Sequence, residues 1–177
     1  SVRIQPSKFA AIPTGFKEGV GVSFGCERFA RASSMASRPI RFYADTSVYG
    51  GVFDDDFGES SRLFFDEVLA GRFRLVISPL VGDELKDAPE PVKAIFARVR
   101  SGAEIANVTE EAVRLQQAYL AANIVGTRWE TDALHVAIAT VSACAAIVSW
   151  NFKHIVNFAR IPLYNGVNLS SGYAAIA

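Results

Sequence analysis

Apolar residues follow two alternating patterns along the chain from residue 39 onward. Short apolar runs predict strands at 40–44, 74–78, 105–108 and 145–149. Between them, apolar positions three and four residues apart predict helices, which begin near Glu59, Leu80, Pro91, Glu110 and Glu130. A further short helix is expected over 152–158, followed by an irregular C-terminal segment. Strands that alternate with helices indicate an α/β fold whose mostly parallel sheet is covered on both faces.

Glycine, proline and threonine mark the expected boundaries of these elements. Gly50 and Gly51 predict a turn after the first strand, and Gly71 is a natural end for the helix after it. Pro79 suits the first turn of a helix, and Thr109 is a good N-cap. The expected apolar faces are Leu63, Phe64 and Val68 in the first helix and Ala112, Leu115, Tyr119 and Ala122 in the helix after Thr109.

Residues 1–38 show no sustained period and contain several glycines and serines. We therefore expect an irregular N-terminal extension over 1–38 and a single folded domain over 39–177. The only methionine is Met35, just before the first strand, which suggests that translation starts there and that the upstream residues are a start-site artefact.

Composition narrows the class of protein. Cys26 and Cys144 lie in unlike contexts, so no disulfide framework is predicted and a reducing cytoplasm fits best. The apolar run 133–148 is interrupted by polar residues and is interpreted as a buried helix that leads into a strand, with no membrane span. Residues 39–177 carry twelve Lys or Arg against sixteen Asp or Glu, which does not suit a protein that wraps duplex nucleic acid.

Four polar residues fall where ligands collect in such a sheet. Asp45 ends the first strand, Glu84 lies in the helix after the second, Asp132 opens the buried helix, and Asn151 follows the last strand. At one edge of an α/β sheet these side chains can converge. Clustered carboxylates repel one another unless a cation neutralises them, and oxygen ligands suit Mg²⁺ or Mn²⁺. Each residue alone is more often a turn former, a helix cap or a solvated side chain.

Four blocks in order resemble the PIN-domain family, and most closely the VapC-type toxins of type II toxin–antitoxin pairs. The blocks are Phe42 to Ser47, Ile77 to Leu85, Asp132 to Ala139 and Ser149 to His154, and the likeness covers about 41–173. The resemblance implies a three-layer α/β/α sandwich with a mostly parallel central sheet. It also implies a metal-dependent endoribonuclease with an RNA substrate, a cognate antitoxin protein, no membrane association and the capacity to form a homodimer.

The same resemblance assigns roles to individual residues. It implies that Asp45, Glu84 and Asp132 are catalytic and hold Mg²⁺ or Mn²⁺, with Asn151 at the family's fourth acidic position. An amide brings no charge, so a second metal is in doubt. Ser47 is a candidate hydroxyl contact to substrate. When bound, the metal would activate water and stabilise charge on the phosphoryl oxygens.

Other polar and aromatic residues have competing interpretations. His135 is more often a satisfied core histidine than a general base. Trp129 is a candidate contact for single-stranded RNA and Lys153 for its phosphates, whereas Trp150 is expected in the core. The Asp54–Asp56 run lacks the pattern of a Ca²⁺ loop and is expected to be a solvated turn.

Two further functions compete with the ribonuclease. A catalytically degenerate PIN-like binding module is suggested by Asn151 in place of an acid. A phosphoreceiver-like domain fits less well, because Asp132 begins a helix and does not end a strand in mid-chain.

Overall fold

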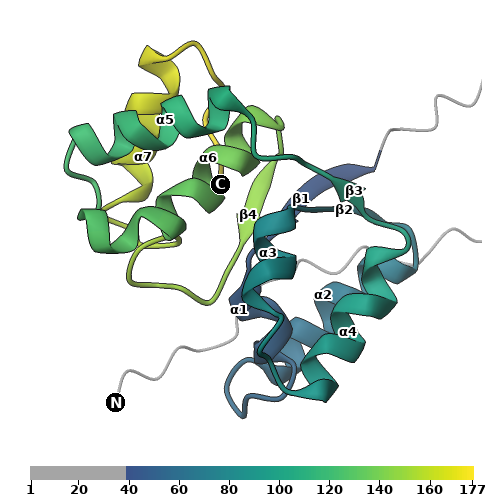
Figure 1. Cartoon of the computed structure of the whole chain (residues 1–177). Helices are drawn as coiled ribbons and strands as arrows, with labels where there is room; N and C mark the ends of the chain where they lie inside the picture. The colour runs from purple at the N-terminus through teal and green to yellow at the C-terminus, as the bar shows by residue number, and fades with distance from the viewer. Residues whose placement is uncertain (1–38) are drawn as a thin grey trace, which may run out of the picture. The chain divides into compact units, whose positions relative to one another are not determined.

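Four strands form one parallel sheet in the order β3-β2-β1-β4 (Figure 1). The computed structural model describes residues 39–177. The strands are β1 (Ile40–Ala44), β2 (Phe73–Ile77), β3 (Glu104–Ile105) and β4 (Ala146–Val148). The chain therefore moves outward from β1 through β2 to β3 and returns to place β4 on the other side of β1. The expected α/β class and parallel sheet are confirmed.

Helices cover both faces of this sheet. They are α1 (Thr46–Gly51), α2 (Gly58–Leu69), α3 (Pro79–Glu84), α4 (Glu90–Arg100), α5 (Glu110–Ala121), α6 (Glu130–Val141) and α7 (Ile161–Ser170), with a short 3₁₀ turn at Thr127–Trp129. Successive residues of a strand point to opposite faces. Phe42 of β1 packs edge-on against Phe64 of α2, whereas Tyr43 packs against His135 of α6. The arrangement is a three-layer α/β/α sandwich.

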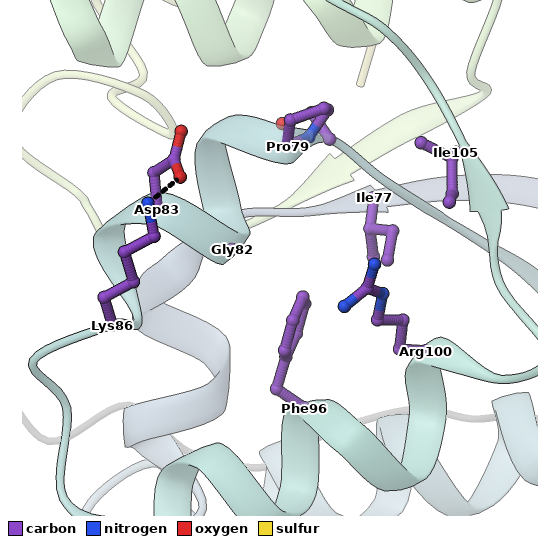
Figure 2. A pocket seen from close by; sticks show the side chains of 9 residues that line it. Ile77, Pro79, Gly82, Asp83, Lys86, Phe96, Arg100 and Ile105 are labelled. Carbon is purple, nitrogen blue, oxygen red and sulfur yellow. Dashed lines mark ion pairs between the residues drawn. The ribbon is translucent and has the colours of Figure 1, made fainter.

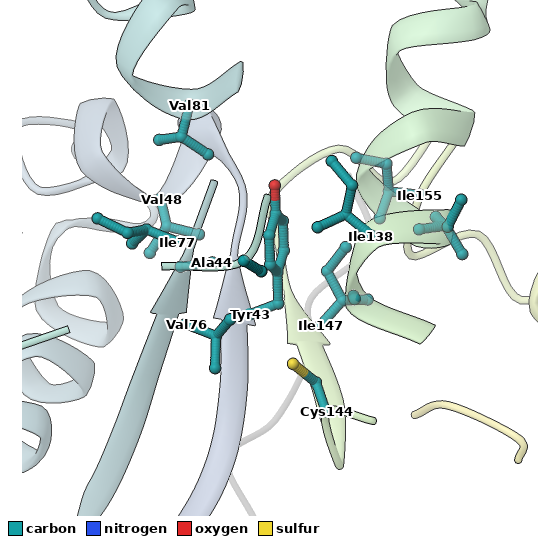
Figure 3. Packing of buried hydrophobic residues seen from close by; sticks show 14 of the residues in the cluster. Tyr43, Ala44, Val48, Val76, Ile77, Val81, Ile138, Cys144, Ile147 and Ile155 are labelled. Atoms are coloured by element: carbon teal, nitrogen blue, oxygen red, sulfur yellow. The ribbon is translucent and has the colours of Figure 1, made fainter. Parts of the chain in front are cut away.

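Tyr43 lies at the centre of the core between the two halves of the sheet (Figure 3). Its side chain is fully buried, with Val76 of β2 on one side and Ile138 of α6 and Ile147 of β4 on the other. A buried tyrosine needs a partner for its hydroxyl group. The Tyr43 hydroxyl points toward the carboxyl ends of the strands (Figure 3), where the polar residues gather.

Several boundaries agree with the sequence. The Thr109 side chain accepts from the backbone N–H of Ala112, as expected for an N-cap, and Pro79 stands in the first turn of α3. Gly71 has a φ of 75°, the left-handed conformation in which glycine ends a helix most easily. The run 133–148 forms most of α6, which ends at Val141, and then β4, as expected of a buried helix that leads into a strand.

The predicted turn at Gly50 and Gly51 is wrong, because these glycines end helix α1. A Cβ on Gly51 would lie 2.5 Å from the indole Nε1 of Trp150, so the residue is small to allow close packing. Two expected apolar positions are also exposed: Leu63 in α2 and Ala122 after α5. Phe65 and Ser61 are buried in α2 instead.

The predicted helix at 152–158 is wrong, and the segment forms turns. Asn151 Oδ1 accepts from His154 N–H, and Asn157 bonds with its amide to the carbonyl of Phe152. Such side-chain bonds compete with a helix. The C-terminal segment, expected to be irregular, contains helix α7. Its buried face includes the polar Asn168, so the spacing of apolar residues did not indicate a helix.

The last residue pairs with the outer edge of β4. Ile147 N–H donates to the Ala177 carbonyl at 2.9 Å, and Ala177 N–H to the Ala145 carbonyl at 3.4 Å. No helix within residues 39–177 is both long enough and apolar enough to cross a membrane. The predictions for residues 1–38, including the start at Met35, and the comparison of Cys26 with Cys144 concern residues outside the described range.

Candidate active site

The four predicted polar residues lie at the carboxyl edge of the sheet. Asp45 directly follows β1, Asn151 comes three residues after β4, Glu84 ends α3, and Asp132 lies in the first turn of α6. The strand order reverses between β1 and β4, and ligands of open α/β sheets bind at such a switch point. The topology thus places Asp45 and Asn151 just beyond the ends of the two strands that flank this position.

Asp45 is 4% exposed, and both of its carboxylate oxygens accept hydrogen bonds from serines. Ser47 Oγ donates to Oδ1 at 2.6 Å, and Ser149 Oγ donates to Oδ2 at 2.9 Å. Burial raises the pKa of Asp45 above its ordinary value, and the bonds from Ser47 and Ser149 and the nearby His135 only partly oppose this. The ionised form is therefore costly here, as expected for a group that a cation would stabilise.

Glu84 lies at one end of a chain of hydrogen bonds that runs into the core. Its Oε2 accepts from Thr46 Oγ1 and lies 3.1 Å from His135 Nε2. The opposite nitrogen of the ring, Nδ1, lies 2.8 Å from the Tyr43 hydroxyl, which is 2.7 Å from Ser78 Oγ. Partial burial raises the pKa of Glu84, but the bond and charge of His135 and the bond from Thr46 outweigh it and hold the pKa below its ordinary value.

Asp132 has one satisfied and one unsatisfied carboxylate oxygen. Asn151 Nδ2 donates to Oδ1 at 3.0 Å, while Oδ2 is buried and has no hydrogen-bond partner. Asn151 also connects to the first acid, because its backbone N–H donates to Ser149 Oγ at 2.9 Å and Ser149 donates to Asp45. A buried oxygen without a partner is costly, and a cation or a water can satisfy it.

Two hydrogen-bond networks hold the four predicted residues, and helix α6 joins the two. Asp45 connects through Ser149 and Asn151 to Asp132, whereas Glu84 bonds to His135, which lies on α6 with Asp132. Ser149 of the first network and Tyr43 and Ser78 of the second were missed in the sequence, because single hydroxyl residues carry no spacing pattern. His135 is buried and hydrogen-bonded, as expected of a satisfied core histidine, and it also bonds to Glu84.

The oxygen donors fit a hard divalent cation. One observation supports this fit: Asp132 Oδ2 is buried and has no hydrogen-bond partner. In residues 39–177 no three His, Cys, Asp or Glu side chains are grouped closely enough to hold a metal ion by themselves. Mg²⁺ is often bound by only one or two carboxylates together with waters and substrate phosphates, so a full protein cage is not required.

A cationic and aromatic cluster lies beside Asn151. The Trp129 ring stacks on His154 at 4.2 Å between centroids, with Lys153 Nζ 5.2 Å and the Arg128 guanidinium 5.3 Å from the ring. Both ring nitrogens of His154 are buried without a partner, and burial lowers its pKa. Trp129 and Lys153, the two residues considered from the sequence as RNA contacts, thus lie against each other in one cluster.

The other expectations have mixed outcomes. Ser47 already donates to Asp45 and accepts from the backbone N–H of Trp150 at 2.8 Å, so its hydroxyl positions the carboxylate. Trp150 is half-buried, stacks on Phe57 and donates to Ser61 Oγ. Asp54 caps an exposed turn by accepting from Asp56 and Phe57 backbone N–H groups, in agreement with a solvated turn.

Comparisons with known proteins add a fold likeness. No family model matches the chain, and no curated protein matches it. One similar solved structure is VapBC2 from Rickettsia felis bound to a DNA fragment from its promoter. The likeness has a TM-score of 0.48 and 19% sequence identity, and covers 66% of this chain and 93% of that one. A likeness of this extent does not assign a function.

Proposed function

We propose that the chain is a metal-dependent endoribonuclease and the toxin of a toxin–antitoxin pair. The observation that carries the proposal is the placement of Asp45, Glu84, Asp132 and Asn151 at the carboxyl edge of a parallel sheet, with Asp132 Oδ2 buried and unpartnered. The resemblance of the four sequence blocks to VapC-type toxins supports the choice of substrate and of partner, an antitoxin protein. The same resemblance is the basis for a homodimer, and the cysteines, which predict no disulfide framework, are the basis for a cytoplasmic location.

Asp45, Asp132 and Glu84 would hold Mg²⁺ or Mn²⁺, with Asn151 as a neutral fourth member. When bound, the ion supplies Lewis acid stabilisation of phosphoryl charge and lowers the pKa of water. Ser47 and Ser149 fix the orientation of the Asp45 carboxylate, and His135 fixes that of Glu84. A side chain held by two partners loses little freedom when substrate binds, which favours catalysis by orientation.

Substrate contacts come from the cluster next to Asn151. Lys153 and Arg128 provide positive charge for backbone phosphates, and the Trp129 ring, on which His154 already stacks, is the aromatic group proposed to contact an unpaired base. Stacking requires a base outside a duplex, so this cluster favours single-stranded RNA. The domain as a whole is negatively charged, so we expect it to contact a short RNA strand only through this local cluster.

The test is cleavage of a mixed RNA pool by the purified full chain with Mn²⁺ or with EDTA. Metal-dependent cleavage that Asp45→Asn and Asp132→Asn abolish would support the proposal. Asp55→Asn is the matched control, because Asp55 is an exposed aspartate outside the network. Cleavage that persists in EDTA, or in both site variants, would refute it.

One observation favours a second candidate, a catalytically degenerate binding module. Both ends of the Asn151 amide are engaged, since Nδ2 donates to Asp132 and Oδ1 accepts from His154 N–H. The amide thus donates to Asp132 Oδ1. An acid at position 151 could not donate there, and Oδ1 would be free to bind a cation. Wild-type protein that neither binds Mn²⁺ nor cleaves RNA, together with an active Asn151→Asp variant, would establish this alternative.

A further inference from the structure

A pocket of about 330 Å³ lies between α3 and α4 at the carboxyl ends of β2 and β3 (Figure 2). This volume falls within the range of small-ligand sites, about 300 to 1,000 Å³. Its apolar wall is formed by Ile77, Pro79, Phe96 and Ile105, and its charged groups are Asp83, Lys86 and Arg100. A mostly apolar pocket with a few charged groups is typical of a binding site for an organic anion.

Of the charged groups in this pocket, Arg100 has no partner within the described part of the chain and can bind an anion. Lys86 Nζ forms an ion pair with Asp83 Oδ1 at 2.6 Å. The Arg100 guanidinium makes no hydrogen bond or ion pair with any residue in 39–177, and it lies 5.9 Å from the centre of the Phe96 ring. Figure 2 shows both side chains extending from α4 into the pocket. An anion that enters would meet an unpaired cation beside an aromatic ring.

Phe96 is held so that its ring borders the pocket. Tyr49 packs edge-on against the ring, with centroids 5.4 Å apart and planes at 77°. A Cβ on Gly82 of α3 would lie 3.7 Å from Cζ, at the tip of the ring. Glycine at this position therefore leaves the tip of the ring without a side-chain contact from this residue. Ile105 of β3 is 53% exposed and gives the pocket a second apolar surface for a flat ring.

We propose that this pocket binds a nucleotide, with the base against Phe96 and Ile105 and the phosphate on Arg100. Arginine pairs with phosphate through two parallel hydrogen bonds, and bases stack on aromatic rings and on guanidinium planes. The nucleotide can belong to an RNA strand or be a free mononucleotide, since both present the same base and phosphate. In the first case the inference rests on the proposed ribonuclease function.

Continuity with the candidate active site favours a nucleotide over an acidic peptide. Ser78 lines the pocket and also bonds to the Tyr43 hydroxyl, which leads to His135 and Glu84. Asp83 of the pocket is next to Glu84 on α3. The carboxyl edge of the sheet therefore carries the carboxylates at β1 and β4 and the pocket at β2 and β3, so one strand of RNA could contact both.

The experiment is calorimetric titration of the full chain in EDTA with adenosine monophosphate and, separately, with single-stranded octaadenylate. Arg100→Ala is expected to weaken binding by about tenfold or more, in line with the loss of a charge-assisted hydrogen bond. The matched control is Arg98→Ala, which removes the same charge from the opposite face of α4 and should change affinity less than about twofold. Gly82→Leu fills the space at the tip of the Phe96 ring and should also weaken binding, while circular dichroism checks the fold.

The outcomes separate the sources of the ligand. Binding of both probes that depends on Arg100 supports a nucleotide site open to free mononucleotides, and binding of the octanucleotide alone supports an RNA strand. No binding of either probe, or equal losses in Arg98→Ala and Arg100→Ala, overturns the inference. Preferential binding of a glutamate-rich peptide to the pocket also overturns it.

The nuclease proposal can fail separately. Asp45→Asn should abolish cleavage but leave the affinity for adenosine monophosphate in EDTA unchanged, because Asp45 does not line the pocket. A wild-type chain that binds nucleotide through Arg100 but cleaves no RNA would refute the nuclease and keep the pocket. A chain that cleaves RNA but shows no nucleotide binding that depends on Arg100 would support the nuclease and refute the nucleotide pocket.

Discussion

Nε2 of His135 lies 3.1 Å from Oε2 of Glu84, while Nδ1 of the same ring faces the Tyr43 hydroxyl at 2.8 Å. Burial raises the pKa of Tyr43 far above its ordinary value, so the phenol keeps its proton. If Ser78 donates to Tyr43 and Tyr43 donates to Nδ1, the ring carries its proton on Nε2 and donates to Glu84. The network therefore predicts one tautomer for His135.

Nitrogen-15 NMR of histidine-labelled protein tests this tautomer, since the sequence has only two histidines. His135 should show a protonated Nε2 and an unprotonated Nδ1. Tyr43→Phe should leave the proton on Nε2, because the Glu84 carboxylate still accepts from it, but should lower the free energy of unfolding by about 1 to 3 kcal/mol, because Nδ1 then lacks a partner. His154 is the internal control, as its ring nitrogens have no partner and should not respond. A proton on Nδ1 of His135 in the wild type would contradict the assignment.

Asp45→Asn is predicted to stabilise the apoprotein while it removes a candidate metal ligand. Because the pKa of Asp45 is raised in the fold, the folded state holds its proton to higher pH than the unfolded state does. Stability is then lost as pH rises from about 3.8 through the folded pKa, and the loss persists at neutral pH. Asparagine does not ionise and has no such loss, so the free energy of unfolding of Asp45→Asn should exceed that of the wild type by about 1 kcal/mol near neutral pH in EDTA.

Urea denaturation at neutral pH and again below the ordinary pKa of Asp45 measures this gain. The difference between variant and wild type should shrink at the lower pH, where Asp45 is protonated in both states. Glu84, whose pKa is lowered, makes the opposite contribution, which is lost as pH falls, but both proteins share it. A variant that is less stable than wild type at neutral pH would show that the serine bonds outweigh the cost of burial.

Gly51 and Gly50 are predicted to respond oppositely to alanine. At Gly51 a Cβ would lie 2.5 Å from Trp150 Nε1 and 2.7 Å from Ser61 Oγ, whereas at Gly50 nothing lies within 4 Å. Gly51→Ala should cost about 1 to 3 kcal/mol through overpacking, and Gly50→Ala in the same helix should gain about 0.5 to 1 kcal/mol. Chemical denaturation compares them. Equal stability of the two variants would mean that Trp150 moves without cost.

Trp150 also links this packing to the site, because its backbone N–H donates to Ser47 Oγ and Ser47 donates to Asp45. RNA cleavage by Gly51→Ala should therefore fall more than its loss of stability explains. Gly50→Ala should keep wild-type cleavage and serves as the control for any change in α1.

The sequence predicted β1, β2 and β4 well because these strands are short apolar runs between clear helix signals. The third strand, expected over 105–108, is only Glu104–Ile105, and both of its residues are exposed. The sequence prediction failed at 46–51 and 152–158, where tertiary packing and side-chain bonds decide the backbone. Gly51 has no side chain, which allows Trp150, a residue distant in sequence, to pack against its backbone. Asn151 and Asn157 form side-chain hydrogen bonds that stabilise turns in a segment whose apolar spacing is helical. Neither effect can be derived from local propensity.

The sequence also located the acidic residues, since each stands at the end of a predicted element. It could not reveal how they are held. Ser149 bridges Asp45 to Asn151, and Tyr43 supports His135, yet both residues belong to strand segments whose pattern signals only burial. The direction of a buried hydroxyl depends on partners about a hundred residues away, which periodicity does not record.

Asn151→Asp is predicted to make folding of this protein depend on metal. The substitution replaces the donor to Asp132 Oδ1, now at 3.0 Å, with a second carboxylate, and like charges so close destabilise each other. In EDTA the free energy of unfolding should fall by about 1 to 3 kcal/mol. Mn²⁺ should restore it, because a divalent cation neutralises both groups. Thermal unfolding with and without Mn²⁺ measures the effect.

The matched control for this change is Asn123→Asp, which adds the same charge at an exposed residue whose φ of 53° asparagine and aspartate both tolerate. It should shift neither stability nor the response to Mn²⁺. If Mn²⁺ stabilises Asn151→Asp well beyond wild type, the carboxyl edge of the sheet is a cation site limited by its missing acid. If Mn²⁺ stabilises neither protein, the unpartnered oxygen of Asp132 is satisfied by water, and the metal-dependent mechanism loses its structural basis.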